Sequence, residues 1–150
     1  MKIASFFGHR DVALTLELSI SIDSTILDLV QNKGVSIFYF GGFGDFDDYC
    51  FNSVTKLKQD FPYLQRIYCV EDIRLLRESK RPQYLSNKGF DDYIHLPLKY
   101  DYWYTRIYYR NCEMVDASDF IVYFIRNIEN SGAYKCYKYA KKVKKSIIML

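Results

Sequence analysis

A glycine-rich segment near residue 41 has the composition of an anion-binding loop. It directly follows an apolar run at 35–40 and reads Gly41-Gly42-Phe43-Gly44-Asp45-Phe46-Asp47. Glycines allow the backbone to approach a ligand closely and to adopt positive φ angles. A helix that follows such a loop directs unpaired N–H groups and the positive end of its dipole toward it. We therefore predict that the whole segment contacts a phosphate-bearing ligand, the alternative being a flexible strand–helix turn.

The acidic residues of this segment offer three kinds of chemistry. Asp45, Asp47 and Asp48 can act as acid or base, bind a ribose hydroxyl, or cap the following helix. An acidic residue close to the ribose is common in nucleotide sites. For Asp47 we predict a ribose or base contact, with helix capping as a compatible second role.

Two further loops follow predicted strands. They read Gly8-His9-Arg10-Asp11 and Asn130-Ser131-Gly132-Ala133. Arg10 can clamp a phosphate, the alternative being an exposed basic turn. The second loop opens a helix, so its small residues suit another phosphate or a ribose, and an ordinary helix cap is the alternative. The predicted ligand contacts in the two loops are Gly8, His9, Arg10, Ser131, Gly132 and Ala133.

Two arginines are placed to share one face of a later helix. Arg106 and Arg110 are four residues apart, and like charges at that spacing repel unless an anion lies between them. Glu113 is one candidate for that anion, and a ligand phosphate is the other. We include Arg106, Arg110 and Asn111 among the predicted ligand contacts.

Tyrosines and one tryptophan gather around the start of the same helix. Such side chains can stack on a base, pack in the core or form a subunit interface. We favour the core or a subunit interface over base stacking. The aromatic residues concerned are Tyr100, Tyr102, Trp103, Tyr104, Tyr108 and Tyr109.

Predicted strands and helices alternate along the chain. Apolar runs bounded by glycine or polar residues predict strands at 2–7, 35–40, 66–70, 120–125 and 146–150, with a short additional one at 91–96. Apolar residues at helical spacing predict helices around 22–30, from 47 or 48 to 61, from 101 to 114, and at 133–144. Residues 71–90 show no assignable pattern.

This alternation predicts a single Rossmann-like α/β domain over residues 1–150. Continuous apolar strands joined by helices are typical of a three-layer fold, with a mainly parallel sheet of about five strands and helices on both faces. Ligands of such folds bind beyond the carboxyl ends of the strands, where the strand order reverses. We expect the loops near residues 8, 41 and 131 to meet at that edge.

The charge and length of the chain narrow the range of partners. A net charge of +3 tolerates an anionic ligand, and the lysines between Lys138 and Lys145 are typical of a solvated helix face, which argues against a nucleic-acid partner. Four cysteines without CxxC spacing indicate a reducing, cytoplasmic location. We predict no metal site, no cofactor and no membrane segment.

The order of these motifs resembles the SLOG superfamily, which includes the DprA/Smf proteins and the Lonely Guy phosphoribohydrolases. The resemblance rests on the Gly8-His9-Arg10 loop, the glycine segment through Asp47, the stretch from Arg110 to Asp119, and the Ser131-Gly132 loop. It is greatest to the small stand-alone bacterial branch with a Gly-His-Arg start. It implies a Rossmann-like fold and a nucleotide-derived ligand, which some members hydrolyse and others sense.

Two signatures of the Lonely Guy enzymes compare differently with this chain. Their catalytic arginine lies in an Arg-Lys-x-x-Met stretch, which Arg110 and Met114 match. Their Pro-Gly-Gly-x-Gly-Thr-x-x-Glu signature retains only Gly132, and its glutamate falls near Lys135 or Cys136. Because glycosidic cleavage builds positive charge on the ribose, it needs a carboxylate nearby, and Asp47 from another loop is the substitute available.

Three functions remain open at this point. The first is a sensor or sequestering protein that binds a nucleotide or nucleotide-derived signal. The second is a hydrolase of N-glycosidic or related bonds in nucleotides, with Asp47 as acid or base and Arg110 orienting the phosphate. The third is a DNA-associated protein like DprA. We also expect a homodimer or higher homo-oligomer.

Overall fold

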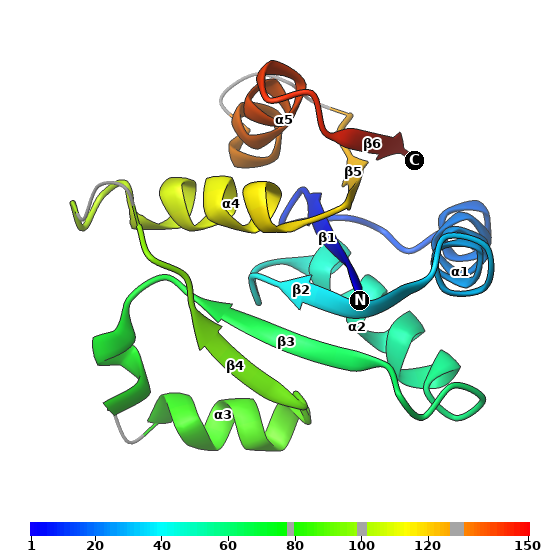
Figure 1. Cartoon of the computed structure of the whole chain (residues 1–150), viewed down its shortest axis with the longest axis horizontal. Coiled ribbons are helices and arrows are strands. Elements are labelled where there is room, and N and C mark those ends of the chain that lie inside the picture. Colours follow the sequence, from blue (N-terminus) through cyan, green and yellow to red (C-terminus); the bar gives the residue numbers. More distant parts are fainter. Residues whose placement is uncertain (78–79, 99–101, 127–130) are drawn as a thin grey trace.

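The computed structural model describes residues 1–77, 80–98, 102–126 and 131–150 (Figure 1). Within these residues, six strands form one sheet in which every pairing is parallel. The strands are β1 (Lys2–Gly8), β2 (Val35–Phe40), β3 (Gln65–Val70), β4 (Asp92–His95), β5 (Phe120–Phe124) and β6 (Ser146–Met149). The predicted α/β class and parallel sheet are thus confirmed, with six strands in place of about five because both short edge strands pair.

The strand order, β4-β3-β2-β1-β5-β6, reverses at the centre of the sheet. The chain moves outward from β1 to β4, then returns to place β5 on the other side of β1. Connections after β1 and β5 therefore leave in opposite directions, which opens a crevice at the carboxyl ends of these strands. The fold places its candidate ligand position at this crevice.

Helices cover both faces of the sheet. They are α1 (Leu16–Gln31), α2 (Asp45–Leu57), α3 (Lys80–Lys88), α4 (Arg106–Ala117) and α5 (Gly132–Lys142), with a short 3-10 helix, η1 (Ile73–Arg77). Helices α1 and α2 pack together on one face, and α4 and α5 pack together on the other (Figure 1). This arrangement gives the three layers that the alternating pattern predicts.

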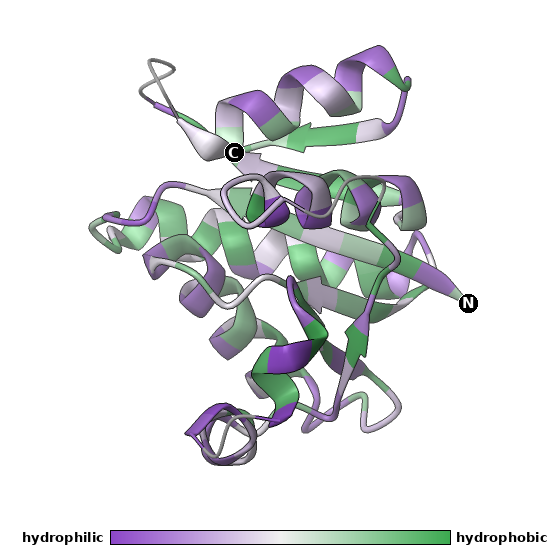
Figure 2. Cartoon of the chain, turned by 90° about the vertical axis from the view of Figure 1, so that its left-hand side faces the viewer, coloured by the Kyte–Doolittle hydropathy of each residue, from purple (hydrophilic) through white to green (hydrophobic). Residues whose placement is uncertain are grey.

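Alternation along the strands divides the core between the two faces. Phe6 of β1 packs with α1 and α2, whereas its neighbour Phe7 packs with α4 and α5. On β3, Tyr68 and Val70 pack against Leu85 of α3. Because successive strand side chains point to opposite faces, a run of apolar residues fills both cores. Figure 2 shows the hydrophobic residues concentrated on the strands and on the parts of the helices that face them.

Several boundaries differ from the sequence predictions. Helix α2 begins at Asp45, with Gly44 as its N-cap residue, so Asp47 and Asp48 lie inside the first turn and the predicted cap by either of them is wrong. The helix ends at Leu57, before the predicted end at residue 61. The unassigned segment 71–90 contains η1 and α3. The predicted cap at residue 101, and residues 100 and 130, lie outside the described residues.

Candidate ligand-binding site

A cavity of about 430 Å³ lies at the carboxyl edge of the sheet. All three loops that the sequence singled out line it, together with α4. The lining residues are Phe6, Phe7, Gly8, His9, Arg10, Gly41, Phe43, Asp47, Ile107, Arg110, Asn111, Ser131, Gly132 and Ala133. Segments far apart in the sequence thus meet at one place, as expected for the point where the strand order reverses.

Two amides of the glycine loop donate hydrogen bonds to a carboxyl group of the protein itself. The N–H of Gly41 donates to Oδ1 of Asp47 at 3.3 Å, and the N–H of Gly42 donates to Oδ2 at 3.1 Å. Asp47 is only 7% exposed. The two amides that the sequence suggested for a ligand phosphate are therefore occupied by the Asp47 side chain.

The N-terminus of α2 is also occupied by a neighbouring loop. The N–H of Asp45 donates to the carbonyl oxygen of Arg10 at 2.7 Å, and the Asp45 carboxylate accepts from the N–H of Val12 at 3.0 Å. Gly44 permits this approach because its φ is +94° and a Cβ there would lie 2.6 Å from the Arg10 Cα. These contacts join the loop after β1 to the start of α2.

Arg110 is a buried arginine at the back of the cavity. Its side chain comes from α4, and the residue is 2% exposed. Nη1 donates to the carbonyl oxygens of Gly41 at 2.9 Å and Cys69 at 3.3 Å, while Nε and Nη2 donate to Oδ1 of Asn111. A Cβ at position 41 would lie 2.6 Å from Nη2, so glycine is required for the guanidinium to come this close.

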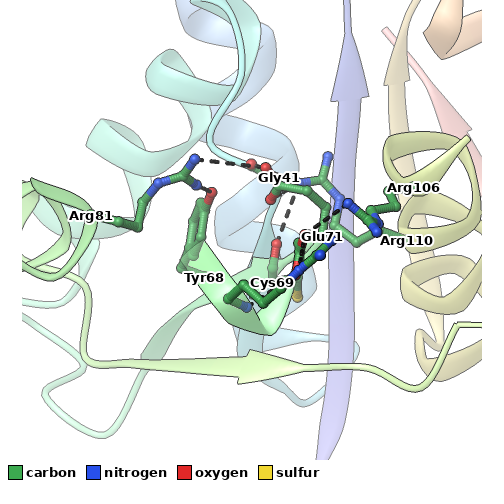
Figure 3. Close-up of polar contacts among 9 residues, drawn as sticks. Gly41, Tyr68, Cys69, Glu71, Arg81, Arg106 and Arg110 are labelled. Atoms are coloured by element: carbon green, nitrogen blue, oxygen red, sulfur yellow. Dashed lines mark hydrogen bonds and ion pairs between the residues drawn. The ribbon is translucent and has the colours of Figure 1, made fainter. Parts of the chain in front are cut away.

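A series of charged groups connects Arg110 with Glu71 and Arg81 (Figure 3). Glu71, directly after β3, has one carboxylate oxygen 3.7 Å from Nη1 of Arg110 and the other 3.7 Å from Nη2 of Arg81. Arg81 also donates to the hydroxyl of the buried Tyr68. Asp72 pairs with Arg106 at 2.8 Å. The carboxylates that pair with the two α4 arginines thus come from the end of β3. Among the described residues, Glu113 is not an ion-pair partner of Arg110.

Burial has a strong effect on the Asp47 carboxyl group. Desolvation raises the pKa of Asp47 from 3.8 to about 7, against the opposing effects of Arg110 and of the amides of Gly42 and Gly41. A carboxyl group with such a pKa changes charge close to neutrality. Asp47 can therefore donate or accept a proton within the cavity.

The N-terminus of α5 presents a different environment on the opposite side of the cavity. Ser131 caps the helix by accepting from the N–H of Tyr134, and the first turn contains no acidic residue. No described residue accepts from the N–H groups of Gly132 or Ala133. This helix end keeps the properties of an anion site.

His9 connects the first loop to the strand β5 side of the cavity. Its Nε2 accepts from the N–H of Arg126 at 2.8 Å, and Nδ1 lies 3.5 Å from Oγ of Ser131. Because Nε2 is an acceptor, the neutral ring carries its proton on Nδ1, directed toward the start of α5.

Phe43 lies between two cationic side chains. The guanidinium carbons of Arg10 and Arg110 are 5.9 and 5.5 Å from the centre of its ring. Cation–π attraction at these distances holds both cations near the loop. Arg10 is exposed, in contrast to Arg110, so its charge remains available to a ligand.

Five of the predicted ligand contacts do not line the cavity. Gly42 has the positive φ expected of the loop, and its N–H donates to Asp47. Gly44 and Asp45 join α2 to the first loop. Arg106 pairs with Asp72. Phe46 is fully buried and stacks on Phe124 in the core, with ring centres 5.6 Å apart. Among these, only the backbone roles of Gly42 and Gly44 follow from their residue type.

Sequence reasoning missed Ile107 and Glu71, and also the β1 residues Phe6 and Phe7, which line the cavity. Ile107 lines the cavity one turn before Arg110, and its place on the same helix as the arginines was a usable signal. Glu71 lies in the segment that had no assignable pattern. The aromatic residues before α4 are on the surface, with Trp103 79% exposed. Exposure excludes the core role for Tyr102, Trp103 and Tyr104, and the subunit interface, the other role we favoured, stays a prediction.

Other groups in the described residues give little indication of chemistry. All four cysteines are free and buried. No described helix has the length and apolar character needed to cross a membrane. Within the same residues, no group of three or more His, Cys, Asp or Glu is arranged to hold a metal ion.

Comparison with known proteins shows the fold. No protein-family model matches the chain. No curated protein matches it in sequence. The solved structure of DNA processing protein A (DprA) from Streptococcus pneumoniae matches with a TM-score of 0.68 at 12% sequence identity. The match covers 99% of this chain and 50% of the DprA chain, so this chain spans about half the length of that protein. The chain therefore has the Rossmann-like α/β fold of DprA.

Proposed function

We propose that this protein binds a nucleotide or nucleotide derivative in the cavity at the carboxyl edge of its sheet. The observation that carries the proposal is the meeting of Arg10, Arg110 and the N-terminus of α5 around one cavity with room for a ligand of that size. A nucleotide combines a phosphate, a ribose and an aromatic base, and the cavity walls contain complements to each.

The two ends of the cavity favour one orientation of the ligand. The N–H groups of Gly132 and Ala133 and the side chain of Arg10 suit a phosphate. The carboxyl group of Asp47 on the opposite wall repels a phosphate when ionised and accepts hydrogen bonds from hydroxyl groups. We therefore assign the phosphate to the α5 side and the ribose to the Asp47 side, with Phe43 available to contact the base.

Calorimetric titration with a panel of nucleoside monophosphates, nucleoside diphosphates and ADP-ribose tests this proposal. We expect at least one ligand to bind, and Arg10→Ala to weaken that binding by about tenfold or more through loss of a charge-assisted contact. Lys33→Ala is the matched control, because Lys33 is an exposed cation that precedes β2, at the opposite edge of the sheet. Equal loss in the two variants, or no binding across the panel, would contradict the proposal.

Hydrolysis of an N-glycosidic bond is a second candidate function. The specific observation is Asp47, whose pKa of about 7 and position in the cavity wall suit a general acid or base. Incubation with nucleoside monophosphates followed by chromatography for free base measures the activity directly. We expect Asp47→Asn to abolish any release of base while ligand binding persists; release that is unchanged in this variant would exclude Asp47 as the acid or base.

A DNA-associated role is a third candidate, supported by the fold shared with a DNA processing protein. That match does not support our sequence-based expectation against nucleic acid. Fluorescence anisotropy with a labelled single-stranded oligonucleotide, at low and moderate salt, distinguishes this role. Binding that a mononucleotide displaces would place the oligonucleotide in the same cavity, and no binding at low salt would exclude the role.

A further inference from the structure

We infer that the cavity takes up a proton at Asp47 when it binds an anion, because Asp47 and Glu71 compete with that anion for the charge of Arg110. This inference rests on the proposed function, since it requires an anion in the cavity. It adds that occupancy of the site depends on pH through a carboxyl group that need not touch the ligand phosphate.

The Gly41 peptide unit connects Asp47 to Arg110. The N–H of Gly41 donates to Oδ1 of Asp47, and the carbonyl oxygen of Gly41 accepts from Nη1 of Arg110. Asp47 and Arg110 both line the cavity and are both buried. An anion that enters the cavity therefore meets one guanidinium that already attracts a buried carboxylate.

Glu71 is the second carboxylate that faces Arg110. It is 8% exposed, and its Oε2 makes no hydrogen bond with any described residue. The separation of 3.7 Å from Nη1 of Arg110 is too long for a hydrogen bond, so the contact acts through charge. Arg81 lies equally far from the other oxygen and shares its own donors with Tyr68, so it balances Glu71 only in part.

Charged and titratable groups from three elements, α2, α4 and β3, surround Asp47. Arg110 of α4 attracts the Asp47 carboxylate, Asp48 of α2 repels it, and the amides of Gly41 and Gly42 stabilise it. Burial raises the pKa values of the thiols of Cys50 in α2 and Cys69 in β3, and Asp47 raises them further. The latter two remain neutral over the physiological range, so Asp47 and Arg110 dominate the local charge.

The net charge of Asp47, Glu71 and Arg110 depends on the protonation state of Asp47. With both carboxylates ionised, Asp47, Glu71 and Arg110 carry a net charge of −1, which opposes an anion. Protonation of Asp47 brings the three groups to neutrality and leaves the attraction of Arg10 and α5 unopposed. By linkage, an anion that favours the protonated state raises the pKa of Asp47, and its own affinity falls as the pH rises.

Sulfate is a suitable probe because it keeps the same charge from acid to alkaline pH. Its affinity for the full chain is measured from NMR shifts of the Gly132 and Ala133 amides. For uptake of one proton at a group with a pKa of about 7, we expect sulfate affinity to fall about 30-fold between about pH 6 and about pH 8.5. Asp47→Asn removes this dependence, and Asp28→Asn, an exposed change on α1, preserves it.

Two measurements keep the test decisive if Asp47→Asn does not fold. In the wild type, saturating sulfate should move the carboxyl titration of Asp47, followed by carbon NMR, to higher pH. In Glu71→Gln the same titration should move to lower pH, because one repelling charge has gone.

The possible failures separate this inference from the proposed function. Sulfate binding with the same affinity at both pH values overturns proton uptake and leaves the cavity as an anion site. Asp47 titration that does not move with sulfate has the same meaning. Absence of any sulfate effect on the α5 amides at either pH overturns both the inference and the assignment of the phosphate.

Discussion

Helices α2 and α5 begin at the same edge of the sheet, but the amides at their N-termini differ in whether the protein itself supplies an acceptor. Helix α2 carries Asp45, Asp47 and Asp48 in its first turn, and its loop amides bind Asp47. Helix α5 has no acidic residue in its first turn, and the amides of Gly132 and Ala133 have no described acceptor. One terminus is neutralised by the chain, and the other still carries its positive potential.

The comparison teaches that a glycine loop before a helix is an incomplete criterion for a phosphate site. Glycines at 41, 42 and 44 serve the approach of Arg110 and Arg10 and the turn toward α2. The donors become available to a ligand only where no side chain of the protein has occupied them. By that criterion α5, with a single glycine, is the better phosphate site.

The largest expected effect is a dependence of stability on pH that comes from Asp47 at the α2 terminus and has no counterpart at α5. The folded pKa of Asp47 is raised, so the folded chain binds more protons than the unfolded chain between about pH 4 and pH 7. The stability that results is complete below the unfolded pKa and lost as the pH rises through 7. We expect the free energy of unfolding to fall by about 2–3 kcal/mol between about pH 5 and about pH 8 through Asp47 alone.

Denaturant unfolding of the wild type and Asp47→Asn across that pH range measures this effect. The difference between the two curves isolates Asp47. Asp72 and Asp91 do not interfere, because their arginine and lysine partners lower their pKa values to about 2. If the unfolding free energies of the two proteins changed with pH in parallel, ionisation of Asp47 would have little effect on stability.

A pair of glycine substitutions comes next in size. Gly41→Ala places a methyl group 2.6 Å from Nη2 of Arg110, whereas Gly132→Ala meets no atom within 4 Å. We expect Gly41→Ala to reduce the free energy of unfolding by about 2 kcal/mol through steric crowding of a buried ion, and Gly132→Ala to change it by less than about 0.5 kcal/mol. Urea unfolding compares them, and equal losses would refute the close approach of Arg110.

Loss of the α5 cap is a smaller effect. Ser131→Ala removes the acceptor for the N–H of Tyr134 and should cost about 1 kcal/mol of stability. Hydrogen exchange of the first α5 amides should increase, while exchange in α2 should not. A uniform increase through both helices would show global rather than local destabilisation.

The smallest expected change in stability comes from a substitution that gives α5 an acidic first turn like that of α2. Gly132→Asp places a carboxylate at an exposed position in the first turn of α5, which should stabilise the helix by about 0.5 kcal/mol through its dipole. The same change should abolish phosphate binding at that terminus. Calorimetry with the ligand found in the nucleotide panel checks the loss; unchanged affinity would place the phosphate elsewhere.

The sequence predicted the fold well because its signals are local. Apolar runs at 35–40 and 120–125 and the residues that end them identify strands without knowledge of their partners. Convergence of the loops near residues 8, 41 and 131 then follows from parallel topology. Both short edge strands were identified as well, whereas η1 and α3 were not, since short polar segments bury few residues and carry weak periodicity.

The side-chain contacts within the site could not be predicted in the same way. Whether Asp47 caps its helix, contacts a ligand or turns back to Gly41 depends on one rotamer and on the tertiary position of the loop. Glu71 gave no signal because its role exists only once α4 packs beside the end of β3. Contacts of this kind connect residues with no fixed spacing in the sequence.

The hydrogen bonds of Arg110 limit what that residue can offer a ligand. A guanidinium has five N–H groups, and four of those in Arg110 are directed to Gly41, Cys69 and Asn111. A ligand can receive one hydrogen bond from it without disturbing the others, which excludes fork-like recognition of two oxygens. Arg110 is thus held in one position, and we expect discrimination between ligands of different length or branching to depend on the solvent-exposed Arg10.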